Sequence, residues 1–209
     1  MCIAKWHVER SSSRHPRNMI LALPGRGVPA EAMIDFILHT GVEAPLVVAF
    51  EPKRFEWYPQ PNGALDQDEA CAGLDENLSV LADEIERAGR AFDVPTNRTH
   101  IVGYSAGAVM GVTLVTRALL QPFGSAFVMA GAILQPERVG KAACDTPILL
   151  RHNRDDACFD WDERYVPMRQ ALRDNGYRVE ADEKNDGNHG VSGYDVRSLR
   201  KFLNRHIVE

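Results

Sequence analysis

The sequence contains no long apolar stretch, no excess of basic residues and no clustered cysteines, and each absence argues against one class of protein. Its apolar runs are broken by Gly, Ser, Thr or Arg before they reach the roughly 18 to 20 residues that a membrane span requires. Lys and Arg number 24 against 29 Asp and Glu, which gives a formal charge of -5. A nucleic-acid-binding protein usually needs a basic face. We therefore expect no stable membrane insertion and no nucleic-acid partner.

The four cysteines, Cys2, Cys71, Cys144 and Cys158, are widely spaced and form no CxxC pair. This spacing predicts neither a disulfide framework nor a zinc site. Cys158 is interpreted as a buried, inert thiol. The first ten residues contain no apolar core of signal-peptide length, so the expected location is the cytoplasm.

What the sequence does contain is the composition of a globular protein, with 44% hydrophobic and 25% charged residues in a chain of 209. Such a chain buries a sizeable core without a disulfide or metal staple. Short apolar runs predict strands at residues 3–8, 19–23, 46–50, 99–103, 126–132, 147–151 and 177–181. Helical periodicity predicts helices at residues 30–39, 68–92, 106–120, 162–175 and 195–206, and residues 54–63 are expected to form a loop.

Short strands that alternate with longer helices predict a mostly parallel sheet covered by helices on both faces. We see no repeat or linker, so a single domain is expected over residues 1–209. In sheets of this kind, ligands bind beyond the carboxyl ends of the strands. The chemistry is therefore expected in the loops that follow the strands.

The segment Gly-Tyr-Ser-Ala-Gly at 103–107 matches the pattern G-x-S-x-G, directly after an expected strand and at the start of an expected helix. A strand-to-helix turn this sharp strains the backbone of Ser105, and the flanking residues must be very small to avoid clashes. Gly103 and Gly107 meet that need. Ser105 is therefore predicted to be a nucleophile at the carboxyl edge of the sheet.

A serine nucleophile needs a general base, which in this architecture follows it in the chain. Three histidines follow Ser105. His206 is interpreted as a solvated surface residue and His152 as a residue that holds a loop. His189 lies in a glycine-flanked loop after the last expected strand and is the predicted base.

The base in turn needs an acid that orients it. Asp155 and Asp156 directly follow an expected strand, and both are within reach of a histidine on a loop. Adjacent loop residues generally point in different directions, so only one is expected to meet the imidazole. The other is expected to face solvent or to accept N–H bonds within the turn. These residues alone leave the choice open.

The motifs resemble those of the phospholipase/carboxylesterase family of α/β-hydrolases, which includes acyl-protein thioesterases and small bacterial esterases. The resemblance covers most of residues 18–206. The family pattern His-Gly-x-x-Asp selects Asp156 as the acid. The resemblance rests on Leu-Pro-Gly-Arg-Gly at 23–27, Trp-Tyr at 57–58, Gly-Tyr-Ser-Ala-Gly at 103–107, His-Asn-Arg-Asp-Asp at 152–156 and the loop around His189.

Three positions depart from the family pattern: Pro24 replaces the usual histidine, Ala106 the usual glutamine and Asn153 the usual glycine. The resemblance implies an oxyanion hole formed by the backbone N–H groups of Arg26 and Ala106. Side-chain replacements leave such a hole intact because it uses the main chain. The shortened side chain at Ala106 means that the substrate of the family is not carried over.

Trp57 and Tyr58 are expected in a loop at the active edge of the sheet. There they either wall the substrate pocket or anchor the loop on the domain, and the sequence favours neither. Arg26, Arg54 and Arg154 also follow strand ends and are interpreted as solvated rather than as an anion-binding site.

The leading hypothesis is a serine esterase of the α/β-hydrolase fold that needs no metal or organic cofactor and has no cap domain, since the loops near the site are short. Its expected partner is a small-molecule ester. Members of such families are often dimers, so a homodimer is an open alternative, but the sequence identifies no self-complementary patch. The same triad would serve a thioesterase, a lactonase, a peptidase or a lysophospholipase. The alternative from another class is a hydrolase-fold binding protein without turnover.

Overall fold

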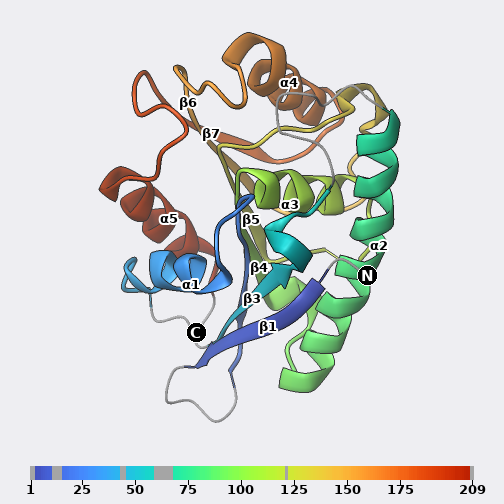
Figure 1. The fold of residues 1–209 in the computed structure, drawn as a ribbon, viewed down its shortest axis with the longest axis vertical. Helices are drawn as coiled ribbons and strands as arrows, with labels where there is room; N and C mark the ends of the chain where they lie inside the picture. Colours follow the sequence, from blue (N-terminus) through green and yellow to red (C-terminus); the bar gives the residue numbers. More distant parts are fainter. Residues whose placement is uncertain (1–2, 11–15, 43–45, 59–67, 121, 208–209) are drawn as a thin grey trace.

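The computed structural model describes residues 3–10, 16–42, 46–58, 68–120 and 122–207, and a seven-stranded sheet forms its centre (Figure 1). The strand order is β1-β3-β2-β4-β5-β6-β7. The first strand pairs antiparallel with its neighbour, and the other pairs are parallel, which confirms the predicted mostly parallel sheet. The strands are β1 (Ile3–Arg10), β2 (Met19–Leu23), β3 (Leu46–Pro52), β4 (Thr99–Tyr104), β5 (Ser125–Met129), β6 (Ile148–Asn153) and β7 (Val179–Lys184).

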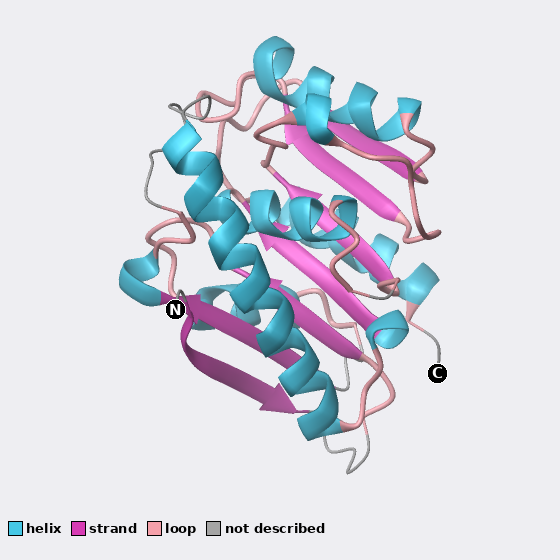
Figure 2. Cartoon of the chain, turned by 90° about the vertical axis from the view of Figure 1, so that its right-hand side faces the viewer, coloured by secondary structure: helices cyan, strands magenta, loops and turns pink. Residues whose placement is uncertain are grey.

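Helices cover both faces of the sheet. The ribbon shows α1 and α5 on one face and α2, α3 and α4 on the other (Figure 1), and the turned view shows the long α2 lying across its face (Figure 2). The helices are α1 (Ala30–Leu38), α2 (Asp68–Phe92), α3 (Ala106–Thr116), α4 (Val166–Asp174) and α5 (Gly193–His206). Shorter turns are η1 (Lys53–Phe55), η2 (Thr96–Arg98), η3 (Pro136–Arg138) and η4 (Trp161–Tyr165), the last of which runs into α4.

The core consists of two apolar clusters, one on each side of the sheet. In β2, Leu21 and Leu23 belong to the cluster under α2 and α3, while Ile20 and Ala22 belong to the cluster under α1 and α5. A strand that is covered on both faces has to be apolar at successive positions. The helix α3 is buried at every position because it packs against β4 and β5 and also beneath α2. Its small residues are what permits that placement.

Two predicted elements end earlier than the sequence suggests, each beside a left-handed residue. The helix predicted for 106–120 ends at Thr116, and Ala118 has a φ of 49°. The strand predicted for 126–132 ends at Met129, because Ala130 also has a φ of 49° and turns the chain away. Neither alanine carries a turn signal in the sequence.

The last strand is displaced from its predicted position at 177–181. β7 begins at Val179 and continues through charged residues that the sequence suggested were loop. Those charges have partners: Asp182 accepts hydrogen bonds from the hydroxyls of Tyr194, at 2.6 Å, and Ser198. An edge strand tolerates charge when neighbouring side chains bind it.

The predicted edge strand at 3–8 is β1, and the predicted loop at 54–63 lies outside the described residues from residue 59 onward. Within the described ranges, no helix combines the length and the apolar character needed to cross a bilayer. Nor do the described segments fold into a cap above the carboxyl edge of the sheet.

Candidate active site

Ser105 occupies the turn between β4 and α3, at the carboxyl edge of the sheet. Its backbone has φ 53° and ψ -120°, a combination that costs energy for any residue with a side chain. Two backbone hydrogen bonds hold this conformation: the Ser105 N–H donates to Met129 O at 2.9 Å, and the Ser105 carbonyl accepts from the N–H of Val109 at 3.1 Å. The turn is therefore fixed by its neighbours on both sides.

Gly107 allows the nucleophile turn to approach the end of β2 closely. A Cβ atom at this position would lie 2.1 Å from the carbonyl oxygen of Leu23 and 2.5 Å from that of Pro24. A Cβ on Gly25 would in turn lie 3.2 Å from the Cβ of Ser105. This contact brings the segment with the predicted oxyanion residue Arg26 directly beside the nucleophile.

The two residues predicted to form the oxyanion hole come from the segment after β2 and from the start of α3. Ala106 is the first residue of α3, so its N–H has no partner within its own helix and sits at the positive end of the helix dipole. The Arg26 side chain is engaged elsewhere: Nη1 lies 3.1 Å from Glu56 Oε1, and Nη2 donates to Tyr58 O at 2.9 Å. These contacts fix the loop that carries the backbone of Arg26.

Trp57 and Tyr58 are buried, with 0% and 1% of their surface exposed. The indole Nε1–H of Trp57 donates to Pro24 O at 2.7 Å, and the N–H of Gly27 donates to Phe55 O at 3.0 Å. Of the two alternatives that the sequence left open, this geometry favours the anchor over the pocket wall. The aromatic pair therefore anchors the loop that carries Pro24 and Arg26.

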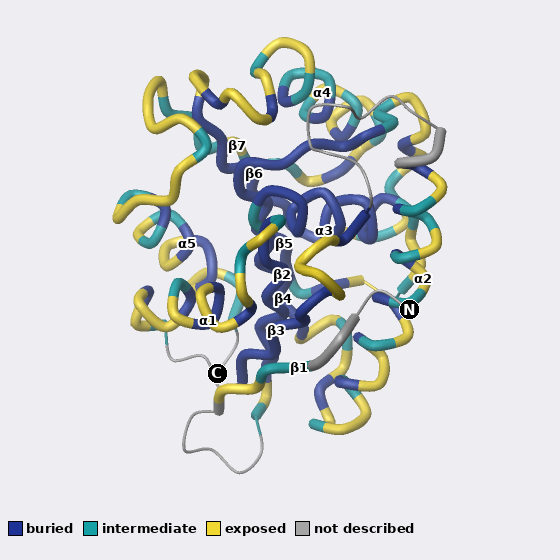
Figure 3. The backbone as a smooth tube through the Cα atoms, viewed as in Figure 1, coloured by how far each residue is buried: buried dark blue, intermediate teal, exposed yellow. Residues whose placement is uncertain are grey.

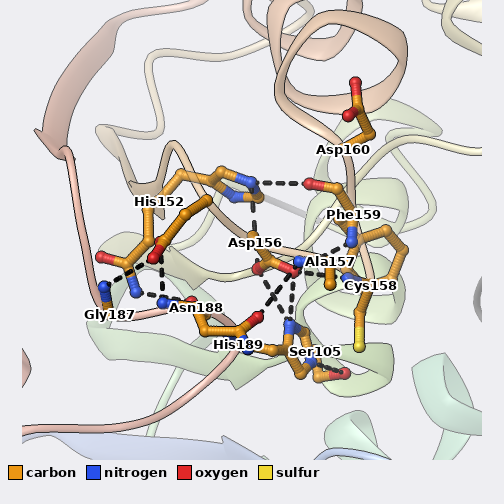
Figure 4. A network of polar contacts seen from close by, with 12 residues as sticks. Ser105, His152, Asp156, Ala157, Cys158, Phe159, Asp160, Gly187, Asn188 and His189 are labelled. Carbon is orange, nitrogen blue, oxygen red and sulfur yellow. Dashed lines mark hydrogen bonds and ion pairs between the residues drawn. The ribbon is translucent and has the colours of Figure 1, made fainter.

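The structure brings Ser105, His189 and Asp156 together from three separate loops (Figure 4). His189 Nε2 lies 2.8 Å from Ser105 Oγ, and His189 Nδ1 lies 2.8 Å from Asp156 Oδ2 and 3.0 Å from Oδ1. The Tyr104 hydroxyl donates to the carbonyl of His189 at 2.6 Å. Of the two adjacent aspartates, Asp156 and not Asp155 faces the imidazole.

The environment of Asp156 keeps its carboxylate ionised. Its Oδ1 accepts the backbone N–H of Cys158 at 2.8 Å and that of Phe159 at 3.0 Å. Burial raises the pKa of Asp156, but the hydrogen bonds from His189, Phe159 and Cys158 and the charge of His189 together outweigh it, so the pKa lies below its usual value. An ionised Asp156 accepts the Nδ1–H of His189 and leaves the Nε2 lone pair directed at Ser105.

His152 supports the loop that carries Asp156. It is buried, its Nε2 lies 2.9 Å from Phe159 O, and its ring stacks on Tyr165 with centroids 4.6 Å apart. Burial lowers the pKa of His152, which favours the neutral ring that donates to that carbonyl. Its place agrees with the sequence-based interpretation of a histidine that holds a loop.

Two interpretations from the sequence are wrong. Cys158 is exposed rather than buried, although its backbone N–H donates to the buried Asp156. His206 is half-buried rather than solvated: its ring packs against Phe202 with centroids 4.7 Å apart, and burial lowers its pKa.

Asn153 holds the histidine loop, a role that its place in the sequence did not predict. Asn153 Nδ2 donates to the carbonyl of Asn188, the residue before His189, at 2.7 Å. Asn153 Oδ1 accepts from Arg151 Nη2, also at 2.7 Å. Gly187 has a φ of 128°, and a Cβ there would lie 2.8 Å from Asn153 Nδ2. The only signal in the sequence was the departure from the family pattern at Asn153.

A second set of contacts ties the same loop to the segment around Asp156. Asp155 accepts the N–H of Gly187 at 3.2 Å and that of Asn188 at 2.7 Å. Asn188 Oδ1 accepts the N–H of Ala157 at 3.2 Å and that of His189 at 2.8 Å. Asp155 thus accepts backbone bonds, as expected, but from the histidine loop rather than from its own turn.

Among the described residues, two groups of three side chains have ligand atoms close enough together for one metal ion: Asp156, Cys158 and His189, and His7, Glu31 and Glu51. In the second group the two ring nitrogens of His7 face different carboxylates, Glu31 at 2.8 Å and Glu51 at 3.4 Å. Ion pairs account for that arrangement without a metal.

The sheet, its helices and this loop geometry define an α/β-hydrolase. Residues 22–207 match the sequence model of the family described as Phospholipase/Carboxylesterase. The chain therefore belongs to that family and is a carboxylesterase-type hydrolase. No curated protein sequence matches the chain.

Solved structures share the fold over nearly the whole chain. The esterase PE8 has 20% identity and a TM-score of 0.84, covering 96% of this chain and 97% of its own. A phospholipase/carboxylesterase from Dyadobacter fermentans has 18% identity and a TM-score of 0.81, with coverage of 100% and 99%. The Bacillus cereus carboxylesterase has 14% identity and a TM-score of 0.79, with coverage of 97% and 94%. At these identities the likeness establishes the fold alone.

Proposed function

We propose that the protein hydrolyses carboxylic esters through an acyl-enzyme intermediate, with Ser105 as nucleophile, His189 as general base and Asp156 as the orienting acid. The observation that carries the proposal is the pair of 2.8 Å contacts of His189, one from Nε2 to Ser105 Oγ and one from Nδ1 to Asp156 Oδ2. Membership of the phospholipase/carboxylesterase family supports the same class of reaction.

In the first half of the reaction, Ser105 Oγ attacks the carbonyl carbon of the ester and its proton moves to His189 Nε2. Asp156 accepts the Nδ1–H and stabilises the imidazolium. The carbonyl oxygen becomes an oxyanion that accepts hydrogen bonds from the backbone N–H groups of Arg26 and Ala106. Loss of one such donor typically costs about 3 kcal/mol of transition-state stabilisation.

The intermediate then collapses, and the bond to the leaving alcohol breaks as that oxygen takes the proton from His189 Nε2. Water attacks the acyl-enzyme by the same route in reverse: His189 accepts its proton, and Ser105 regains a proton when the acid departs.

The proposal is tested by the reaction of the folded protein with a fluorophosphonate probe and with p-nitrophenyl acetate. We expect one probe molecule per chain, attached at Ser105, and a fall in kcat of about 10⁶ in Ser105→Ala, as occurs when the nucleophile of subtilisin is removed. Ser79→Ala, at an exposed position of α2, is the matched control and should retain full activity. Full activity in a folded Ser105→Ala protein would rule out the mechanism.

The same three residues would act equally on thioesters, lactones or lysophospholipids, since each presents a carbonyl with a leaving group. A panel with one substrate of each kind, compared by kcat/KM, decides among them. A folded protein that neither takes the probe nor hydrolyses any of these substrates would instead be a hydrolase-fold binding protein.

A further inference from the structure

Cys158 places an exposed thiol at the mouth of the candidate active site. Its Sγ, a ring nitrogen of His189 and a carboxylate oxygen of Asp156 all lie within 4.8 Å of one another. The close-up shows the Cys158 side chain directed toward Ser105 and His189 (Figure 4). The bond from the Cys158 N–H to Asp156 Oδ1, at 2.8 Å, fixes the main chain from which this thiol projects.

A thiolate, an imidazole and a carboxylate are a ligand set suited to zinc. Zinc sites with three protein ligands leave the fourth position to water. The bond lengths of tetrahedral zinc put its ligand atoms about 3.4 to 3.6 Å apart. The three ligand atoms already lie within 4.8 Å of one another, and rotation of the exposed Cys158 side chain can adjust the position of the sulfur. His189 Nδ1 and Asp156 Oδ2, which are 2.8 Å apart, would have to separate for an ion to enter between them. Sulfur and nitrogen ligands favour Zn²⁺ or Cd²⁺ over Mg²⁺ or Ca²⁺.

We propose that Asp156, Cys158 and His189 form a binding site for Zn²⁺ or Cd²⁺, and that an ion bound there blocks hydrolysis. The site is inhibitory and is distinct from a resident cofactor site, which the proposed chemistry does not require. The inhibition rests on the proposed function, whereas the binding of the ion does not.

A metal ion would inhibit hydrolysis whichever ring nitrogen of His189 it binds. An ion at Nε2 occupies the lone pair that has to accept the proton of Ser105. An ion at Nδ1 inserts between the imidazole and Asp156, so the tautomer is no longer controlled.

Binding also releases the thiol proton to solvent. The ligand form of cysteine is the thiolate, so the Cys158 thiol loses its proton when the ion binds. The ion has to displace that proton, and its affinity is therefore expected to rise with pH.

The first test is a Zn²⁺ titration of p-nitrophenyl acetate hydrolysis in a buffer free of phosphate and chelators. We expect wild type to be inhibited and EDTA to restore the rate. In Cys158→Ala, the Zn²⁺ concentration for half inhibition should rise at least about tenfold, because a ligand is lost. Inhibition of each variant is expressed relative to its own rate without metal, so a change in that rate does not affect the comparison. Cys144→Ala removes a half-buried thiol and is the matched control.

The second test measures binding without reference to turnover. Co²⁺ or Cd²⁺ added to Ser105→Ala should give a thiolate charge-transfer band that saturates at one ion per chain, and the band should vanish when Cys158→Ala is added to that variant. Loss of both the band and the inhibition in Cys158→Ala supports the site. Equal inhibition in wild type and Cys158→Ala, or no thiolate band, overturns it. If wild type hydrolyses no ester, the proposed function fails, and the band alone decides the metal site.

Discussion

The two halves of the candidate site are held by different forces. Around Ser105, main chain packs against main chain: the end of β2, the start of α3 and Ser105 in the turn between β4 and α3 are buried (Figure 3). Around His189, the loop between β7 and α5 is largely exposed and is held by hydrogen bonds from polar side chains. The first half is therefore sensitive to added volume, and the second to the loss of single donors or acceptors.

The largest effect is expected where volume is added to the buried half. Gly107→Ala would place a methyl group 2.1 Å from the carbonyl oxygen of Leu23. A backbone carbonyl cannot move aside as a flexible core side chain can. The loss in free energy of unfolding should therefore be larger than the value of about 1 to 3 kcal/mol that is typical of overpacking, and little folded protein is expected. Circular dichroism and thermal unfolding measure this. Gly140→Ala adds a methyl group in open space and should behave as wild type. A folded Gly107→Ala protein with unchanged Tm would contradict the packing argument.

In the polar half, the largest effect should come from the acid. Asp156→Asn keeps the volume but replaces an acceptor of the His189 Nδ1–H with a group that also donates, which favours the wrong tautomer. We expect kcat for p-nitrophenyl acetate to fall by about 10⁴, as in a trypsin-like triad, with the fold intact. If Asp156→Asn retains its activity, another carboxylate orients the histidine.

Acid should lower the free energy of unfolding through His100, a histidine in the buried region. His100 lies in β4 and is 1% exposed, and burial together with the charge of His206 lowers its pKa to about 4 from the ordinary value of 6.5. His100 binds a proton more readily in the unfolded chain than in the folded protein. Its contribution to the free energy of unfolding is therefore complete above pH 6.5 and is lost as the pH falls from 6.5 toward 4. It amounts to about 3 kcal/mol at most.

Urea unfolding of wild type and His100→Gln at several pH values between 7 and 4 tests this. The free energy of unfolding should fall more steeply with acidification in wild type than in the variant. Parallel curves would mean that His100 does not carry the effect.

The smallest effects are expected at the side chains that hold the histidine loop. Asp155→Asn and Asn153→Asp each remove or reverse one bond to that loop and leave the triad residues in place. We expect kcat to fall by up to about tenfold with KM unchanged, since His189 is less well positioned. Asn153→Asp still offers an oxygen to Arg151, so it isolates the bond to Asn188. The rate of fluorophosphonate labelling should fall in parallel. If Asp155→Asn is as impaired as Asp156→Asn, the two aspartates do not divide their roles as the contacts suggest.

The alternation of elements and the nucleophile turn could be predicted from the sequence because both depend on local constraints. A strand covered on both faces must be apolar throughout, and a sharp strand-to-helix turn must have glycine where another backbone approaches. The helix at Asp68–Phe92 coincides with its predicted bounds because its periodic apolar residues face the core. Ser105 and His189 were predicted for the same reason: strand ends meet at one edge of a parallel sheet.

The remaining features depend on residues far apart in the chain. Asp155 and Asp156 are chemically identical neighbours, and only the path of the loop decides that Asp156 faces His189. The same loop leaves the thiol of Cys158 exposed and close to His189. Whether Trp57 walls a pocket or anchors the loop that follows β2 depends on its bond to Pro24, 33 residues away. Local sequence propensity does not predict contacts between distant segments. Hydrogen bonding and packing between such segments therefore decided how the half of the site around His189 is held.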